Sequence, residues 1–249
     1  MIYILLLIGV YIIHLILKLN WIITGIITVY LICMVPLHRK LYMFQKRQIR
    51  RYEDASMYMD TLLYAFVKEK KVIRAFEDVV STLRDGEMKD IVKKALDHMM
   101  LTFDDTHILL NSMKIIEESY ICERISSIHR FMCHVEFYGG EVKTPVDLLL
   151  EDKNRWISRI DAAIAERKKM FTEIVLSVVA SVIICGIILY LPVMNMDISG
   201  NWIVQILSAV VIILDQIIIY RGQKGLAVDW LRLDEMEDEE YYADKMKQY

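Results

Sequence analysis

The stretch DAAIAERKKMFTEIVLSVVASVIICGIILY, residues 161–190, decides the fold of this chain. Its first ten residues mix alanine with charged side chains, and an apolar run from Ile174 to Leu191 follows and ends before Pro192. No glycine or proline lies between Val146 and Ile174. Because glycine and proline are the residues that interrupt helices, this pattern predicts one helix that passes from a water-exposed domain into a membrane.

Three further apolar runs accompany this one, at Ile2–Leu17, Trp21–Val35 and Trp202–Tyr220. The first two each cover roughly 23 to 24 Å as helices, close to the minimum for crossing the hydrocarbon layer. Together the four runs predict four transmembrane helices in two hairpins. A re-entrant hairpin is the alternative for residues 1–35. A cleaved signal peptide fits poorly, because no basic residue precedes the run and no small-residue cleavage site follows it.

Lysine and arginine set the expected orientation, because segments beside a span that are rich in them stay in the cytoplasm. Such residues follow the second run and precede the third: Arg39, Lys40, Lys46, Arg47, Arg50, Arg51, Arg167, Lys168 and Lys169. The connection at 194–201 carries neither residue type, and Lys18 is alone between the first two runs. We therefore expect a multi-pass protein of the cell membrane with both termini in the cytoplasm.

The composition favours helices and argues against two classes of function. Of the 249 residues, 55% are hydrophobic and 25% charged, and nine glycines and three prolines leave few turns. The net charge of −3 gives no basic field for nucleic acid. No glycine-rich phosphate loop, nucleophile elbow or H-E-x-x-H pair occurs. The sequence therefore predicts an all-α protein that is not an enzyme and needs no cofactor.

Residues 52–170 change to the period of amphipathic helices. Five apolar stripes with spacings of three and four precede the long helix, and they comprise Met59, Leu62, Leu63, Phe66; Val72, Phe76, Val79, Val80, Leu83; Met88, Ile91, Val92, Ala95, Leu96, Met99; Leu109, Met113, Ile116, Tyr120; Ile121, Ile125, Ile128, Met132 and Val135. They predict a cytoplasmic bundle of about six antiparallel helices.

The predicted organisation has five segments. In chain order they are a transmembrane hairpin at 1–36, a basic linker at 37–51, the bundle at 52–170, a second transmembrane hairpin at 171–220 and an acidic tail at 221–249.

A helix–turn motif separates the last two helices of the bundle. Gly139 and Gly140 follow the fifth stripe and supply a left-handed helix stop. Thr144 is then expected as the N-cap of the long helix, with Pro145 at its first position, where proline loses no hydrogen bond.

Several segments stand in an order that characterises one known family. They are the helix pair MDTLLYAF (59–66) and VIRAFEDVV (72–80), the hairpin FYGGEVKTPVDLLLEDKNRW (137–156), the basic stretch RIDAAIAERKK (159–169) and the two following spans. The chain resembles the type II secretion system F family, in the single-copy form associated with tight-adherence (Tad) pilus assembly. It departs from that family at residues 68–71, where Lys-Glu-Lys-Lys replaces a tight glycine turn.

The resemblance implies a non-enzymatic platform protein of the inner membrane. Its cytoplasmic helices would meet a hexameric secretion ATPase, and its spans would handle pilin-like subunits. A second F-family protein or a second copy of the chain would complete the platform. Membrane lipid is a further expected partner, because the basic residues at 39–51 attract anionic lipid at about 1 kcal/mol each.

Asp215 is the candidate for a polar contact inside the membrane. Ionising a carboxyl group in hydrocarbon costs at least about 2.5 kcal/mol unless the group is paired or hydrated, so Asp215 is expected to face other helices. The functional interpretation is a contact with a partner span or a pilin helix, and the alternative is a side chain that snorkels to the interface or bonds locally near Arg221. His14 is a weaker case of the same kind.

Two other clusters invite a functional interpretation. His129 and Cys133 share a helix face, with Cys122 and His134 near them, but tetrahedral metal sites need two compact ligand pairs. The sequence therefore favours ordinary core or surface residues and no metal. The acidic residues Asp234, Glu235, Glu237, Asp238, Glu239 and Glu240 are a candidate docking segment for the ATPase or a sister subunit, or else a merely solvated tail.

The function implied by the resemblance is a membrane platform for assembly of a type IV-like, Tad-type pilus or a related secretion machine, which couples a partner ATPase to pilin movement. A small transporter or channel with a cytoplasmic regulatory domain is the alternative, with Asp215 and His14 as pathway residues. Against it, the four runs hold few polar atoms and show no evident repeat.

Overall fold

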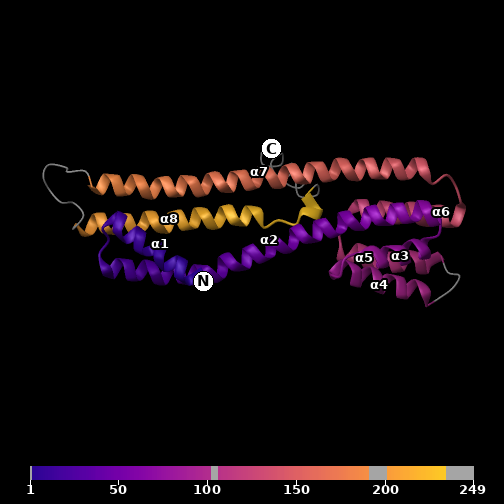
Figure 1. The fold of residues 1–249 in the computed structure, drawn as a ribbon, viewed down its shortest axis with the longest axis horizontal. Coiled ribbons are helices and arrows are strands. Elements are labelled where there is room, and N and C mark those ends of the chain that lie inside the picture. The colour runs from indigo at the N-terminus through magenta and orange to yellow at the C-terminus, as the bar shows by residue number, and fades with distance from the viewer. Residues whose placement is uncertain (1, 102–105, 191–200, 234–249) are drawn as a thin grey trace, which may run out of the picture. The chain divides into compact units, whose positions relative to one another are not determined.

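The computed structural model describes residues 2–101, 106–190 and 201–233, and all regular secondary structure within these ranges is helical (Figure 1). The predicted all-α class is confirmed for this part of the chain. The described residues divide into two compact units. Residues 2–46, 163–190 and 201–228 form the membrane unit, and residues 47–162 and 229–233 form the bundle unit.

The membrane unit contains α1 (Ile2–Leu17), the first half of α2 (Trp21–Glu69), the second half of α7 (Lys143–Tyr190) and α8 (Trp202–Leu226). Helices α2, α7 and α8 are each long and apolar enough to cross a membrane. These three helices indicate a membrane protein. Helix α1 is apolar but has only 16 residues, so the predicted count of four spans depends on this helix.

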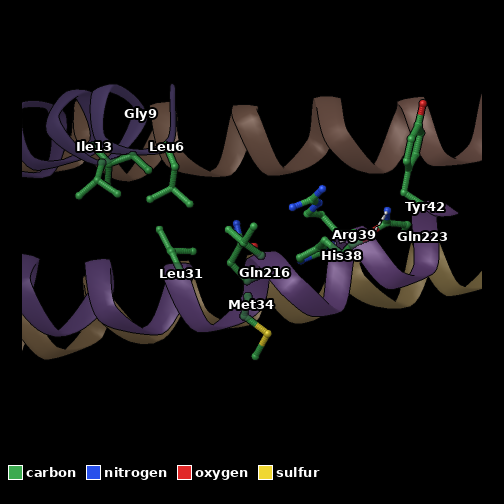
Figure 2. Close-up of a pocket in the computed structure, with 12 residues that line it drawn as sticks. Leu6, Gly9, Ile13, Leu31, Met34, His38, Arg39, Tyr42, Gln216 and Gln223 are labelled. Carbon is green, nitrogen blue, oxygen red and sulfur yellow. Dashed lines mark hydrogen bonds between the residues drawn. The ribbon is translucent and has the colours of Figure 1, made fainter. Parts of the chain in front are cut away.

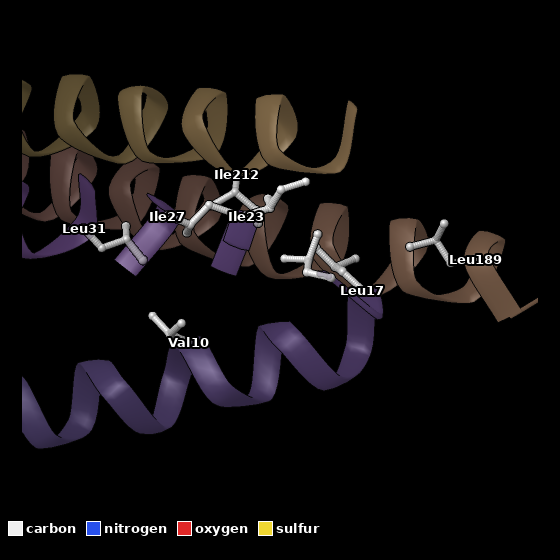
Figure 3. Close-up of a cluster of buried hydrophobic side chains, with 8 residues drawn as sticks. Val10, Leu17, Ile23, Ile27, Leu31, Leu189 and Ile212 are labelled. Carbon is white, nitrogen blue, oxygen red and sulfur yellow. The ribbon is translucent and has the colours of Figure 1, made fainter. Parts of the chain in front are cut away.

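Apolar side chains lie on both the outside and the inside of the membrane unit. On the outside, Ile22, Ile26 and Val29 of α2 are about two-thirds exposed, which suits a helix surrounded by hydrocarbon. On the inside, residues from all four helices and the α1–α2 turn form one buried cluster (Figure 3): Val10, Leu17, Leu19, Ile23, Ile27, Leu31, Leu189 and Ile212.

Two glycines of the membrane unit allow neighbouring helices to approach closely. A Cβ atom at Gly186 of α7 would collide with the Ile16 side chain of α1. A Cβ atom at Gly222 of α8 would lie 3.2 Å from Phe171 and 3.0 Å from Ile174 of α7. Small residues at such contacts are the usual device of membrane helix pairs.

Residues 37–51, which the sequence predicts as a basic linker, are helical and lie in the middle of α2. Pro36 lies inside this helix. Its missing N–H removes a single hydrogen bond, and the following Leu, Lys, Arg, Met and Gln residues are good helix formers. The basic segment therefore continues the helix, and the boundary between the two units lies within it, after Lys46.

The bundle unit consists of the end of α2, α3 (Val72–Thr82), α4 (Glu87–Met100), α5 (Thr106–Ser119), α6 (Glu123–Tyr138) and the beginning of α7. Helix α4 packs against α3 and α5, and α6 packs against α5 and α3. The 3₁₀ helix η2 (Trp230–Arg232) also belongs to this unit.

The predicted apolar stripes form the core of the bundle unit. Met59, Leu62, Leu63 and Phe66 are fully buried, and so are Phe76, Val92, Ile116 and Met132. Ile121 departs from the prediction because it precedes α6 and is 49% exposed. Trp156 of α7 and Trp230 of η2 are the largest side chains in this core.

Helix α7 is continuous over 48 residues, from Lys143 in the bundle unit to Tyr190 in the membrane unit. The absence of a helix-breaking residue between Val146 and Ile174 therefore has the predicted consequence.

Candidate functional site

Three polar residues of α8 lie on its buried face. Gln205, Ser208, Ile212 and Asp215 are each at most 7% exposed, and they follow one another at spacings of three, four and three. The same register continues to Gly222. Polar and small residues in this pattern let membrane helices approach and bond to one another. We call these five residues the α8 stripe.

Asp215 is paired within the membrane unit. Its side chain forms a hydrogen bond with Ser181 of α7. Carboxylate oxygen Oδ2 is buried and has no hydrogen-bond partner within residues 2–101, 106–190 and 201–233. The sequence-based expectation that Asp215 faces other helices agrees with this position. Leaving one carboxylate oxygen unsatisfied is costly, so Asp215 is the least satisfied part of the stripe.

Gln205 holds the turn between α1 and α2. Its amide nitrogen donates to the Lys18 carbonyl at 2.8 Å, and its amide oxygen accepts from the Asn20 N–H at 2.8 Å. Tyr190 of α7 ties the same end of the unit, because its hydroxyl donates to the Leu15 carbonyl at 2.9 Å. The Lys18 ammonium lies 4.3 Å from the centre of the Tyr190 ring.

His14 bonds locally. Its Nδ1 lies 2.9 Å from the Thr24 hydroxyl oxygen, and its ring lies 4.3 Å from the Trp21 ring. These contacts hold the α1–α2 hairpin together, and they satisfy a polar side chain that the sequence places in an apolar run.

Gly139 and Gly140 end α6 as the sequence predicts, with φ angles of 71° and 135°. The ψ angle of Gly139 is −172°, so its backbone lies in the region that only glycine enters readily and not in the left-handed helical region.

The N-cap predicted at Thr144 is wrong. Helix α7 begins at Lys143, and the Val142 carbonyl accepts the first helical bond, from the Val146 N–H at 3.1 Å. The Thr144 hydroxyl donates to the Glu141 carboxylate at 2.5 Å and does not cap the helix. Pro145 still lies in the first turn, where its missing N–H costs nothing.

A chain of buried polar groups crosses the bundle unit. The Tyr58 hydroxyl lies 2.7 Å from His129 Nε2, and His129 Nδ1 lies 2.8 Å from the Glu117 carboxylate. Because a carboxylate only accepts, Nδ1 carries the proton and Nε2 accepts from Tyr58. Burial lowers the pKa of His129, and the His129 hydrogen bond lowers the pKa of Glu117.

The cysteine and histidine residues do not assemble a site with metal-binding geometry. Cys133 contacts the Met113 sulfur at 3.4 Å, and burial raises the pKa of its thiol to about 11. His134 is exposed, whereas His129 is buried. Among the described residues, no three His, Cys, Asp or Glu side chains converge on one point.

The acidic residues Asp234, Glu235, Glu237, Asp238, Glu239 and Glu240 lie outside the described residues. Shortly before them in the chain, Trp230 and Leu231 are buried in the bundle unit. Their burial was not predicted from the sequence, because two apolar residues between charged ones form no periodic pattern.

No protein-family model, curated protein or solved structure matches this chain. Its described residues define a helical membrane protein. The membrane unit carries a buried polar stripe, and the bundle unit has an apolar core like that of a soluble helical domain.

Proposed function

We propose that this chain is a platform protein of the cell membrane for assembly of a type IV-like, Tad-type pilus or a related secretion machine. In this proposal all four apolar helices span the membrane, both termini are cytoplasmic, and the bundle unit receives force from a partner hexameric ATPase. A second platform protein or a second copy of the chain completes the assembly. Pilin-like subunits are the cargo.

The observation that carries the proposal is the continuity of α7. Residues Lys143 to Tyr190 form one helix whose first half belongs to the bundle unit and whose second half is a membrane-length apolar segment. Beyond Pro145 in its first turn, α7 contains no proline, and a helix without an interior proline bends only gently. A push on its cytoplasmic half is therefore transmitted to its membrane half, as a platform requires. The resemblance of segments 59–80 and 137–169 to the F family supports the same function.

A Gly-Pro insertion tests whether α7 acts as a lever, that is, whether it transmits force from its first half to its second half. Placed near Arg167, the insertion interrupts α7 between its two halves and should abolish filament assembly while the protein still reaches the membrane. The matched control places the same dipeptide after Ala227, between α8 and η2, where the backbone is not helical. Electron microscopy of sheared surface filaments, with immunoblots of membrane fractions, measures both outcomes. Full assembly with the first insertion would refute the lever.

Asp215 tests the membrane half of the mechanism. We expect Asp215→Leu to reduce assembly, because the stripe loses the hydrogen bond to Ser181 that ties α8 to α7. Asp215→Asn is the matched variant, since its amide keeps the bond to Ser181. Normal assembly by Asp215→Leu at normal membrane levels would remove Asp215 from the mechanism. Ion or solute flux through vesicles that contain the purified chain would favour the transporter alternative.

A further inference from the structure

A groove of about 480 Å³ lies within the membrane unit, between α1, α2 and α8 (Figure 2). Leu6, Gly9 and Ile13 of α1 and Leu31 of α2 line one end. The other end carries polar groups, of which Arg39 is the cation. The groove therefore has an apolar end and a positively charged end. Its lining includes no residue of the α8 stripe and no residue of α7.

The two ends match the two layers of a membrane leaflet. Along α2, Leu31 and Arg39 are separated by about 12 Å of helix axis, at 1.5 Å per residue. Arg39 follows the last residue of the apolar run, Val35, by one helical turn, so it reaches headgroup depth. The apolar end then lies at the depth of the acyl chains.

Among the described residues, no carboxylate neutralises the charge of Arg39. The groove lining contains no acidic side chain, and no described carboxylate forms an ion pair with Arg39. A cation in this position attracts an anion from the headgroup layer.

Gln223 organises the polar end of the groove. Its amide nitrogen donates to the His38 carbonyl at 3.2 Å, and its amide oxygen lies 2.5 Å from His38 Nδ1. Because an amide oxygen only accepts, Nδ1 of His38 carries a proton. The Tyr220 ring packs edge-on against His38 at 5.8 Å between ring centres. The imidazole is thus fixed beside Arg39 as part of the rim (Figure 2).

We propose that this groove binds one anionic glycerophospholipid. Its phosphate lies at Arg39 and one acyl chain lies along Leu6, Ile13 and Leu31. Basic pockets between membrane helices with an adjoining apolar surface are the sites that recognise such headgroups. A zwitterionic lipid would neutralise Arg39 less well, and free phosphate would leave the apolar end unoccupied. The proposal rests on the membrane location of the helices and is independent of the platform function.

Native mass spectrometry of the purified full chain in detergent, titrated with phosphatidylglycerol or phosphatidylcholine, tests the charged end. We expect one phosphatidylglycerol to bind more tightly than phosphatidylcholine. Arg39→Ala should weaken phosphatidylglycerol binding about fivefold, which corresponds to the attraction of one basic residue near the membrane surface. Lys40→Ala is the matched control, because Lys40 is the adjacent exposed cation and does not line the groove. Equal losses in both variants would mean diffuse attraction and overturn the proposal.

Gly9→Phe tests the apolar end. A Cβ atom at Gly9 would meet no atom within 4 Å, so phenylalanine is expected to enter the groove and displace the acyl chain. Gly25→Phe is the control, since Gly25 is equally open but lies outside the groove. Competition by inorganic phosphate alone, or occupation of the groove by a second copy of the chain in cross-linked dimers, would also overturn the proposal.

Discussion

At the scale of single residues, the most constrained group is His129. Its Nε2 accepts from Tyr58 and its Nδ1 donates to Glu117, and the imidazole is only 1% exposed. Tyr58 is fully buried, and burial raises the pKa of its hydroxyl well above the ordinary value. In the folded bundle unit the Tyr58 hydroxyl proton therefore lies on the bond to His129, and the His129 Nδ1 proton lies on the bond to Glu117.

The free energy of unfolding of the bundle unit is expected to fall as the pH falls below about 6.5. Burial lowers the pKa of His129 from its ordinary value of 6.5. Just below that pH, His129 therefore becomes protonated in the unfolded chain but stays neutral in the folded chain. The contribution of His129 to the free energy of unfolding is fully present above pH 6.5. The lowered pKa of Glu117 has the same sign and acts below its ordinary value of 4.5. Thermal unfolding of the full chain in detergent at pH 7.5 and 5.5 measures the loss.

His129→Gln should reduce this difference between pH 7.5 and pH 5.5. His134→Gln is its control, because His134 lies on the same helix but is exposed. If both variants keep the full difference, another group is responsible for the acid sensitivity.

At the scale of helices and turns, backbone conformation decides which residues are replaceable. We expect Gly139→Ala to destabilise the bundle unit by about 1–3 kcal/mol, because its φ of 71° and ψ of −172° strain any residue with a Cβ atom. Space does not limit the substitution, since a Cβ atom there meets nothing within 4 Å. Hydrogen exchange at the amides of α6 and at the beginning of α7 reports the change.

Gly86→Ala is the matched control for this substitution. Gly86 precedes α4 with a φ of 164°, an extended conformation open to any residue, and its Cβ atom would meet Arg50 at an ordinary 3.5 Å. The expected cost is about 0.5 kcal/mol, because alanine is a poorer N-cap than glycine. Equal effects at both positions would contradict the argument from backbone strain.

Lys70 presents the opposite case. It adopts a φ of 54° in the turn between α2 and α3, where the resemblance to the F family leads one to expect glycine. A left-handed conformation costs an ordinary residue about 1 kcal/mol, so Lys70→Gly should raise the unfolding temperature of the full chain. Lys70→Ala separates the lysine side chain from the backbone, because it keeps the strain. A rise of the same size with alanine would show that charge and not conformation matters.

At the scale of the whole molecule, the distribution of basic residues predicts which side of the membrane each segment faces. We expect a cysteine at Lys94 to be protected from an impermeant maleimide in intact cells, and a cysteine at Asn201 to react. Both positions are exposed, so accessibility is limited only by the membrane. The four native cysteines are replaced by alanine beforehand, and permeabilised cells provide the control. Labelling of Lys94→Cys in intact cells would contradict the cytoplasmic bundle.

The parts of the molecule that were predicted correctly are those with a local pattern. The stripe of Met59, Leu62 and Phe66 repeats every three or four residues, and the glycine pair at 139–140 stops a helix wherever it occurs. The boundary between the two units lies within the predicted linker at 37–51, and this segment is helical because lysine and arginine are good helix formers. The Thr144 cap was wrong because helix ends depend on neighbouring bonds over one or two residues.

The sequence alone determined the helical class, the apolar runs, the alternation of membrane and water-exposed segments and the continuity of α7. These properties follow from propensity and periodicity, which act within a few residues. Only the tertiary structure decided that Tyr58 bonds to His129, that Gln205 holds the α1–α2 turn and that Arg39 borders a groove. Each of these depends on groups far apart in the sequence, separated by 71 residues for Tyr58 and His129 and by 185 for Asn20 and Gln205. No local pattern encodes such pairs, because packing brings them together only after the helices have formed.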